Sequence, residues 1–141
     1  MKTILVAYDD TEPARRALDR AATLAQAFGS RVLVTSIAAL HYSSPRLTLT
    51  VRERGEGIAG REEDLQQAQA ILEERGIPAE TLAARGDPAT AIARLAEEHD
   101  VDLVVVGSRE LGALQRLLGQ SVSQAVSRRV RCDLLIVHPG E

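Results

Sequence analysis

The sequence predicts an α/β protein with a doubly wound, five-stranded parallel sheet and helices on both faces. Strand-like and helix-like patterns alternate along the 141 residues in the order βαβαβαβαβ, which is typical of parallel sheets joined by right-handed crossovers. Aromatic residues make up only 2% of the chain, so the core must be built from Val, Leu, Ile and Ala, as in buried parallel strands. The length fits a single domain over residues 1–141.

The first part of the chain predicts two strands around a helix. Thr3 to Tyr8 is a β-branched and apolar run that predicts the first strand. Thr11 can cap the helix that follows, which has Pro13 in its first turn and stops at Gly29. Arg31 to Ile37 predicts the second strand.

The middle of the chain is less regular. Residues 38–60 mix serines, a proline and glycines in a stretch too long for a routine connection, and we expect a loop there. A second helix is expected from about Arg61 to near Gly76. The short strand that follows, Glu80 to Ala84, has a modest apolar content that suits the edge of a sheet.

The C-terminal part contains the most informative segment. Asp87 and Pro88 open a third helix, which ends at His99. An apolar strand, Asp102 to Gly107, then runs directly into a Ser/Arg/Gly turn and a fourth helical pattern, and Leu134 to Val137 makes the last strand. Rossmann-like α/β proteins hold phosphates where a buried strand opens onto a loop and a helix start.

The expected topology indicates where a ligand would bind. Open parallel sheets bind ligands beyond the carboxyl ends of their strands, at the point where the strand order reverses. The segments expected there are Ala7 to Asp10, Ile37 to Leu40, and the residues from Gly107 onward.

Composition and charge argue against several other classes of protein. A net charge of -3 provides no general attraction for nucleic acid, and no apolar run approaches membrane-spanning length. Cys132 has no partner for an internal disulfide and no signal-peptide pattern opens the chain, so a cytoplasmic location is expected. The histidines lie far apart in sequence, so we expect no metal cluster.

No catalytic set stands out in the sequence. Lys2 is the only lysine, which excludes a Walker A loop, whose lysine meets the outer phosphates. Asp9 and Asp10 resemble the metal-binding pair of a response-regulator receiver, but a receiver also requires an aspartate after a middle strand and a lysine after a late one. The strand that ends at Val106 is followed by Gly107 instead of the required aspartate, and no lysine other than Lys2 is present. No general base has a defined position.

Two groups of residues resemble a known family. The first is Ile4-Leu-Val-Ala-Tyr-Asp9, which places an aspartate at the end of the first strand. The second comprises Val104-Val-Val-Gly-Ser-Arg109, Leu117-Leu118, Ser121-Val-Ser123 and Cys132. Together these marks resemble the universal stress proteins, small doubly wound α/β proteins, over nearly the whole chain.

The resemblance implies an adenine nucleotide, such as ATP or AMP, at the switch point, with Mg²⁺ or Mn²⁺ bound through its phosphates. Asp9 and Ile37 would lie on the adenosine side, although Asp9 could instead cap the first helix and Ile37 could be a core residue. Ser121 and Arg109 would face phosphates. Alternatively, Ser121 could pack as a small helix residue near the sheet, and Arg109 could be exposed to solvent. The candidate binding residues are Ala7, Asp9, Ile37, Gly107, Ser108, Arg109, Gly112, Ser121, Val122 and Ser123.

The phosphate-binding region departs from the pattern of ATP-binding members. That pattern is a glycine, two residues, a second glycine, nine residues, and then a third glycine followed by a serine or threonine. Counted at that spacing from Gly107, the other two glycine positions hold Glu110 and Gln120, while Ser121 is retained. Side chains there obstruct the close approach of backbone N–H groups to phosphate oxygens. A carboxylate about 4 Å from a phosphate charge would cost about 4 kcal/mol at an effective dielectric near 20, roughly a thousandfold in affinity.

The sequence therefore leaves alternatives open. Gly112 and Gly119 lie near the missing positions, and a shifted loop could restore a nucleotide site in a stress-response regulatory or protective protein. The rival is a nucleotide-free dimer that acts through protein partners, using residues 38–60, and a changed ligand with fewer phosphates fits the same substitutions. Dimers of the family join through the last strand, which predicts a homodimer through Leu134 to Val137. In either case we expect binding rather than turnover, with at most weak ATP hydrolysis.

Overall fold

The structure, a computed structural model, describes residues 1–8, 12–37, 51–84, 88–107 and 130–138, with the backbone alone at 13, 37, 51–61, 83, 84, 88 and 89. It confirms the α/β fold. The strands are β1 (Thr3–Ala7), β2 (Arg31–Ile37), β3 (Ala79–Ala84), β4 (Leu103–Gly107) and β5 (Asp133–Val137), and the helices are α1 (Glu12–Phe28), α2 (Val51–Glu74) and α3 (Pro88–Glu98).

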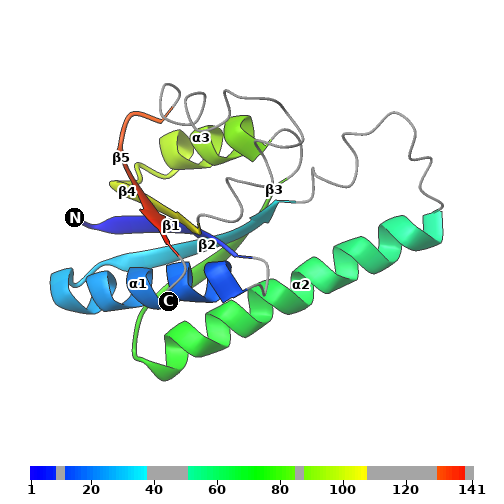
Figure 1. Ribbon diagram of the computed structural model, residues 1–141, viewed down its shortest axis with the longest axis horizontal. Helices are drawn as coiled ribbons and strands as arrows, with labels where there is room; N and C mark the ends of the chain where they lie inside the picture. The colour runs from blue at the N-terminus through cyan, green and yellow to red at the C-terminus, as the bar shows by residue number, and fades with distance from the viewer. Residues whose placement is uncertain (9–11, 38–50, 85–87, 108–129, 139–141) are drawn as a thin grey trace.

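The five strands form one parallel sheet in the order β3-β2-β1-β4-β5. Central β1 pairs with β2 through Ala7 opposite Thr35, and with β4 through Val6 opposite Val105. From β1 the chain proceeds outward to β2 and β3, then returns to the other side of β1 for β4 and β5 (Figure 1). The strand order therefore reverses between β1 and β4, which makes this the switch point of the sheet.

Helices cover both faces of the sheet, with α1 and α2 on one side and α3 on the other (Figure 1). Because successive strand side chains point to opposite faces, Ile4 and Val6 pack in the cluster that contains the α1 and α2 residues, whereas Leu5 packs in the cluster that contains Ile92 and Leu95 of α3. The central strands are thus buried on both faces of the sheet, which is why their sequences are apolar runs and do not alternate between apolar and polar residues.

The start of α2 differs from the expectation. The helix begins at Val51, not near Arg61, so the prediction of a loop was wrong for residues 51–60. Gly55, Gly57 and Gly60 each disfavour a helix by about 1 kcal/mol relative to alanine, but extending a helix that is already nucleated is far easier than starting one. In Figure 1 the N-terminal part of α2 extends beyond the sheet. Neither α2 nor any other described helix is long and apolar enough to cross a membrane.

Two parts of the expected chain lie outside the described residues: positions 38–50 of the loop, and the fourth helix before β5. The other boundaries agree closely with the sequence. β2 has the expected bounds, and β4 begins one residue later than Asp102. The expectation that the Glu80 to Ala84 strand lies at an edge is confirmed, since β3 is terminal in the sheet.

The three described helices end with the same backbone motif. One residue just beyond each helix adopts a left-handed conformation: Gly29, directly after α1, has φ of 67°, and Gly76 and Asp100, two residues after α2 and α3, have φ of 74° and 51°. At the end of α3, the N–H of Val101 donates to the carbonyl of Ala96 at 2.9 Å, the six-to-one bond of a Schellman motif. Glycine is the natural residue for this position, so Asp100 is the exception among the three.

Candidate functional site

The carboxyl ends of β1, β2 and β4 meet at the switch point. Ala7 is the last residue of β1, Ile37 of β2 and Gly107 of β4. Since β1 lies between the other two strands, these three predicted binding residues lie together at the edge formed by the carboxyl ends of the strands. Ala7 is half-buried there and Gly107 is buried. Their part in binding stays a prediction. The other candidates lie outside the described residues: Asp9, Ser108, Arg109, Gly112, Ser121, Val122 and Ser123.

Tyr8 fixes the point at which the chain leaves β1. Its side chain is fully buried, and its hydroxyl donates a hydrogen bond to Oε1 of Gln67 on α2 at 2.9 Å. Its backbone N–H donates to the carbonyl of Thr35 at 2.9 Å. The residue that precedes Asp9 is therefore held by both a neighbouring strand and a helix. The only sign of this role in the sequence is that Tyr8 is an aromatic residue in a chain with very few of them.

Thr35 is not among the binding residues that the sequence predicts. It is fully buried in β2, directly opposite Ala7, and its Oγ1 has no hydrogen-bond partner among the described residues. A threonine suits a strand as well as valine does, so the pattern drew no attention to it. Thr35 and Ser36 follow the apolar run Val32 to Val34 as two polar residues in succession, and nothing in that pattern distinguishes Thr35.

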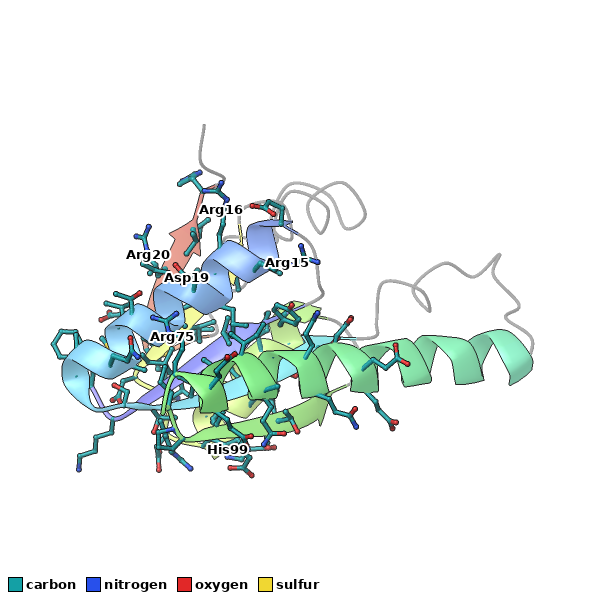
Figure 2. The ribbon with its side chains drawn as sticks, turned by 90° about the horizontal axis from the view of Figure 1, so that it is seen from below. Arg15, Arg16, Asp19, Arg20, Arg75 and His99 are labelled. Atoms are coloured by element: carbon teal, nitrogen blue, oxygen red, sulfur yellow. The ribbon has the colours of Figure 1, made fainter. Side chains whose placement is uncertain are left out.

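Positive charge lies near this edge on α1. Because α1 starts shortly after the carboxyl end of β1, its first turns lie beside the switch point, and Figure 2 shows Arg15 and Arg16 near that end of the helix. Arg16 pairs with Glu12 through Nε and Oε1 at 3.3 Å. Arg15 is exposed. Guanidinium groups at the mouth of a site favour anionic ligands.

A pocket of about 330 Å³ lies at the opposite end of the sheet. The described residues that line it do not include Ala7 or Gly107. Burial raises the pKa of the Cys132 thiol on its wall, so this thiol remains protonated at neutral pH and is a poor nucleophile. The pocket is lined by Ala93, Ala96, Glu97, Asp100, Arg131 and Cys132, among others. In the described part of the chain no three His, Cys, Asp or Glu residues are grouped so as to hold a metal ion.

Comparison with known proteins gives one consistent result. The model of the Universal stress protein family matches residues 1–138. The universal stress protein YxiE of Bacillus subtilis is 33% identical, over 95% of this chain and 97% of its own length. A universal stress protein of Thermus aquaticus, encoded in the 3′ region of the QAH/OAS sulfhydrylase gene, is 36% identical, over 96% of this chain and 98% of its own length.

A solved structure supports the same assignment. The crystal structure of a universal stress protein in complex with cAMP superposes with a TM-score of 0.74 at 28% identity, and the match covers 99% of this chain and 98% of that one. The sequence match and the structural match both extend over nearly the entire chain. The protein therefore belongs to the universal stress protein family.

Proposed function

We propose that this protein binds an adenine nucleotide at the switch point of its sheet and acts in the stress response as a small regulatory or protective protein. The observation that carries the proposal is the arrangement of Ala7, Ile37 and Gly107 at the end of three adjacent strands. Sheets of this topology bind ligands at that edge. The similarity to a universal stress protein solved with cAMP supports the choice of an adenine nucleotide.

The proposed orientation is the one that the resemblance to the family implies. The base and ribose would lie near Ile37 and the end of β1, and the phosphates near Gly107 and the residues that follow it, including Ser121, with Mg²⁺ or Mn²⁺ bound through the phosphates. A ligand with one phosphate would stay farther from Glu110 than ATP does. The similar protein solved with cAMP, whose ligand has a single phosphate, supports that preference.

A second candidate function is that of a dimer which acts through protein contacts without a nucleotide. The observation in its favour is the position of β5, a terminal strand of the sheet that carries half-buried Leu134, Leu135 and Ile136. A terminal strand leaves backbone groups available to a second sheet. We propose a homodimer through β5 and a cytoplasmic location in both cases. Light scattering on the purified protein tests the dimer, and a monomer at high micromolar concentration would contradict it.

Calorimetry tests the nucleotide proposal. The purified protein, checked for copurified nucleotide, is titrated with AMP, cAMP, ADP and ATP in the presence of Mg²⁺ or Mn²⁺, with GMP as the control. We expect AMP and cAMP to bind at micromolar concentration and more tightly than ATP, and no more than weak phosphate release from ATP. The absence of binding by every adenine nucleotide at millimolar concentration would leave the protein-contact function.

A further inference from the structure

Thr35 has an unusual environment for a polar side chain. The residue is 0% exposed, and its Oγ1 is buried with no hydrogen-bond partner in the part of the chain that the structure describes. Buried hydroxyl groups in native proteins are almost always paired, and an exception calls for a specific explanation. Replacing the threonine by valine, which has nearly the same shape, would remove the unpaired group. Its presence therefore suggests that the hydroxyl acquires a partner in another state of the protein.

The position of Thr35 in the sheet indicates what that partner is. Leu33 packs in the cluster formed with α3, and Val34 packs in the cluster formed with α1 and α2. By strand alternation Thr35 faces the α3 side, as Leu33 does. Thr35 lies two residues before Ile37, the carboxyl end of β2, which places it roughly 7 Å below the edge at the usual rise of a strand.

The neighbours of Thr35 across the sheet are apolar. Ala7 of β1 and Leu82 of β3 lie directly opposite it, and both pack in the cluster on the α3 side. The small side chain of Ala7 leaves Thr35 less covered from the β1 side than a larger residue would. The hydroxyl is therefore a buried polar group among apolar neighbours, roughly 7 Å below the edge at which the base of the nucleotide is proposed to lie.

We propose that Thr35 is a specificity-determining residue of the nucleotide site, whose hydroxyl hydrogen-bonds the polar edge of the bound base, directly or through one trapped water. This inference rests on the function proposed above. A hydroxyl can both donate and accept, so it matches the adjacent donor and acceptor groups of a purine edge. The phosphates lie on the β4 side of the switch point in the proposed orientation, so Thr35 acts on the base and not on them.

The test compares Thr35→Val, which keeps the shape and removes the hydroxyl, with Thr35→Ser, which keeps the hydroxyl. Calorimetry with AMP and with ATP is run on both variants and on the natural chain, and thermal unfolding is followed by circular dichroism. We expect Thr35→Val to weaken AMP and ATP by the same factor, roughly tenfold, while its unfolding temperature is unchanged or higher. Thr35→Ser should stay within about threefold of the natural chain.

The outcomes separate this inference from the function on which it rests. If the natural chain binds AMP and Thr35→Val binds it equally well, the role of Thr35 is refuted and the nucleotide site stands. If the natural chain binds no adenine nucleotide, both are refuted. If Thr35→Val does not fold, Thr35→Ala provides the same comparison, and its unchanged affinity for AMP would also refute the role of the hydroxyl.

Discussion

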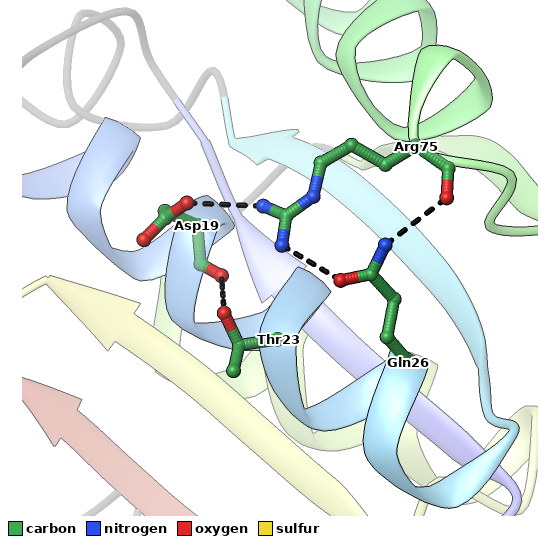
Figure 3. A network of polar contacts seen from close by, with 4 residues as sticks. All are labelled: Asp19, Thr23, Gln26 and Arg75. Atoms are coloured by element: carbon green, nitrogen blue, oxygen red, sulfur yellow. Dashed lines mark hydrogen bonds and ion pairs between the residues drawn. The ribbon is translucent and has the colours of Figure 1, made fainter.

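The guanidinium of Arg75, one residue beyond the end of α2, lies 3.0 Å from Oδ1 of Asp19 on α1 (Figure 3). The same guanidinium donates through Nη2 to Oε1 of Gln26 at 2.9 Å, and Nε2 of Gln26 donates back to the Arg75 carbonyl at 3.1 Å. Thr23 is part of the same group through its hydroxyl, which donates to the Asp19 carbonyl at 3.1 Å. The bonds made by Arg75 join α1 to the end of α2, and these two helices cover one face of the sheet.

Arg75→Ala should lower the free energy of unfolding by about 1 kcal/mol, since it removes one charged hydrogen bond and one ion pair. The ion pair with Asp19 accounts for the smaller part of this loss, because the Asp19 side chain is 74% exposed and the Arg75 side chain is 29% exposed. Asp19→Asn should therefore cost less than about 0.5 kcal/mol. Urea unfolding measures both variants. Equal losses in the two would show that the ion pair, and not the bond to Gln26, joins the helices.

A second prediction concerns the N-terminus. Oδ2 of Asp102 accepts hydrogen bonds from the backbone N–H groups of Lys2 at 2.7 Å and Thr3 at 3.0 Å. These bonds, that of Lys2 most strongly, lower the pKa of the Asp102 carboxyl. A carboxyl whose pKa is lower in the folded state stabilises the protein above its unfolded pKa of about 3.9, and this contribution is lost as the pH falls through the folded value.

Asp102→Asn should therefore destabilise the protein at neutral pH and flatten the dependence of stability on pH below about pH 4. The group is close to solvent, so the loss at neutral pH should be less than about 1 kcal/mol. Urea unfolding from acid to neutral pH measures it. Asp133→Asn is the matched control on neighbouring β5, since its carboxylate has no hydrogen bond in the described part of the structure. Parallel pH profiles for both variants would contradict the role of Asp102.

The helix ends provide a matched pair of substitutions. Asp100 holds a left-handed φ of 51° at the position where Gly76 holds 74° after α2. Asp100→Gly should stabilise the protein by about 0.5 kcal/mol, because the relief of left-handed strain exceeds the added flexibility of the unfolded chain. Gly76→Ala should destabilise it by about 1 kcal/mol. Nothing lies within 4 Å of a Cβ built on Gly76, so a loss there reports backbone strain rather than a steric clash. Thermal unfolding of both variants tests the opposite signs.

The sequence predicted most of the fold because its signals are local. The apolar run of β2 and the glycine after α1 each mark a boundary without reference to the rest of the chain. The start of α2 could not be predicted in the same way, since its first turns contain glycines that disfavour a helix and extend from a segment held by core residues such as Leu65 and Leu72.

The same distinction applies to the candidate site. Ala7, Ile37 and Gly107 could be placed at one edge because strand ends and the parallel topology determine where they meet. Thr35 could not be identified, because its burial and its unpaired oxygen depend on residues of two other strands, Ala7 and Leu82. A β-branched side chain that fits a strand shows nothing of its environment in the sequence.

The last prediction concerns Glu110 and Gln120, which replace two glycines of the ATP-binding pattern. If these side chains obstruct phosphates, Glu110→Gly combined with Gln120→Gly should tighten ATP binding by roughly ten- to a thousandfold, the range set by relief of charge repulsion and of backbone obstruction. AMP, whose single phosphate stays farther from the substituted positions, should gain much less.

Calorimetry with ATP and AMP on three variants separates the two causes. Glu110→Gln removes the charge and keeps the side chain, so it should recover part of the ATP affinity and do so more strongly at low ionic strength, where screening is weak. Gln120→Gly should act independently of salt, because only backbone geometry changes there. Unchanged ATP affinity in the double glycine variant would refute the obstruction, and the cause of any preference for AMP would then lie on the base side of the site.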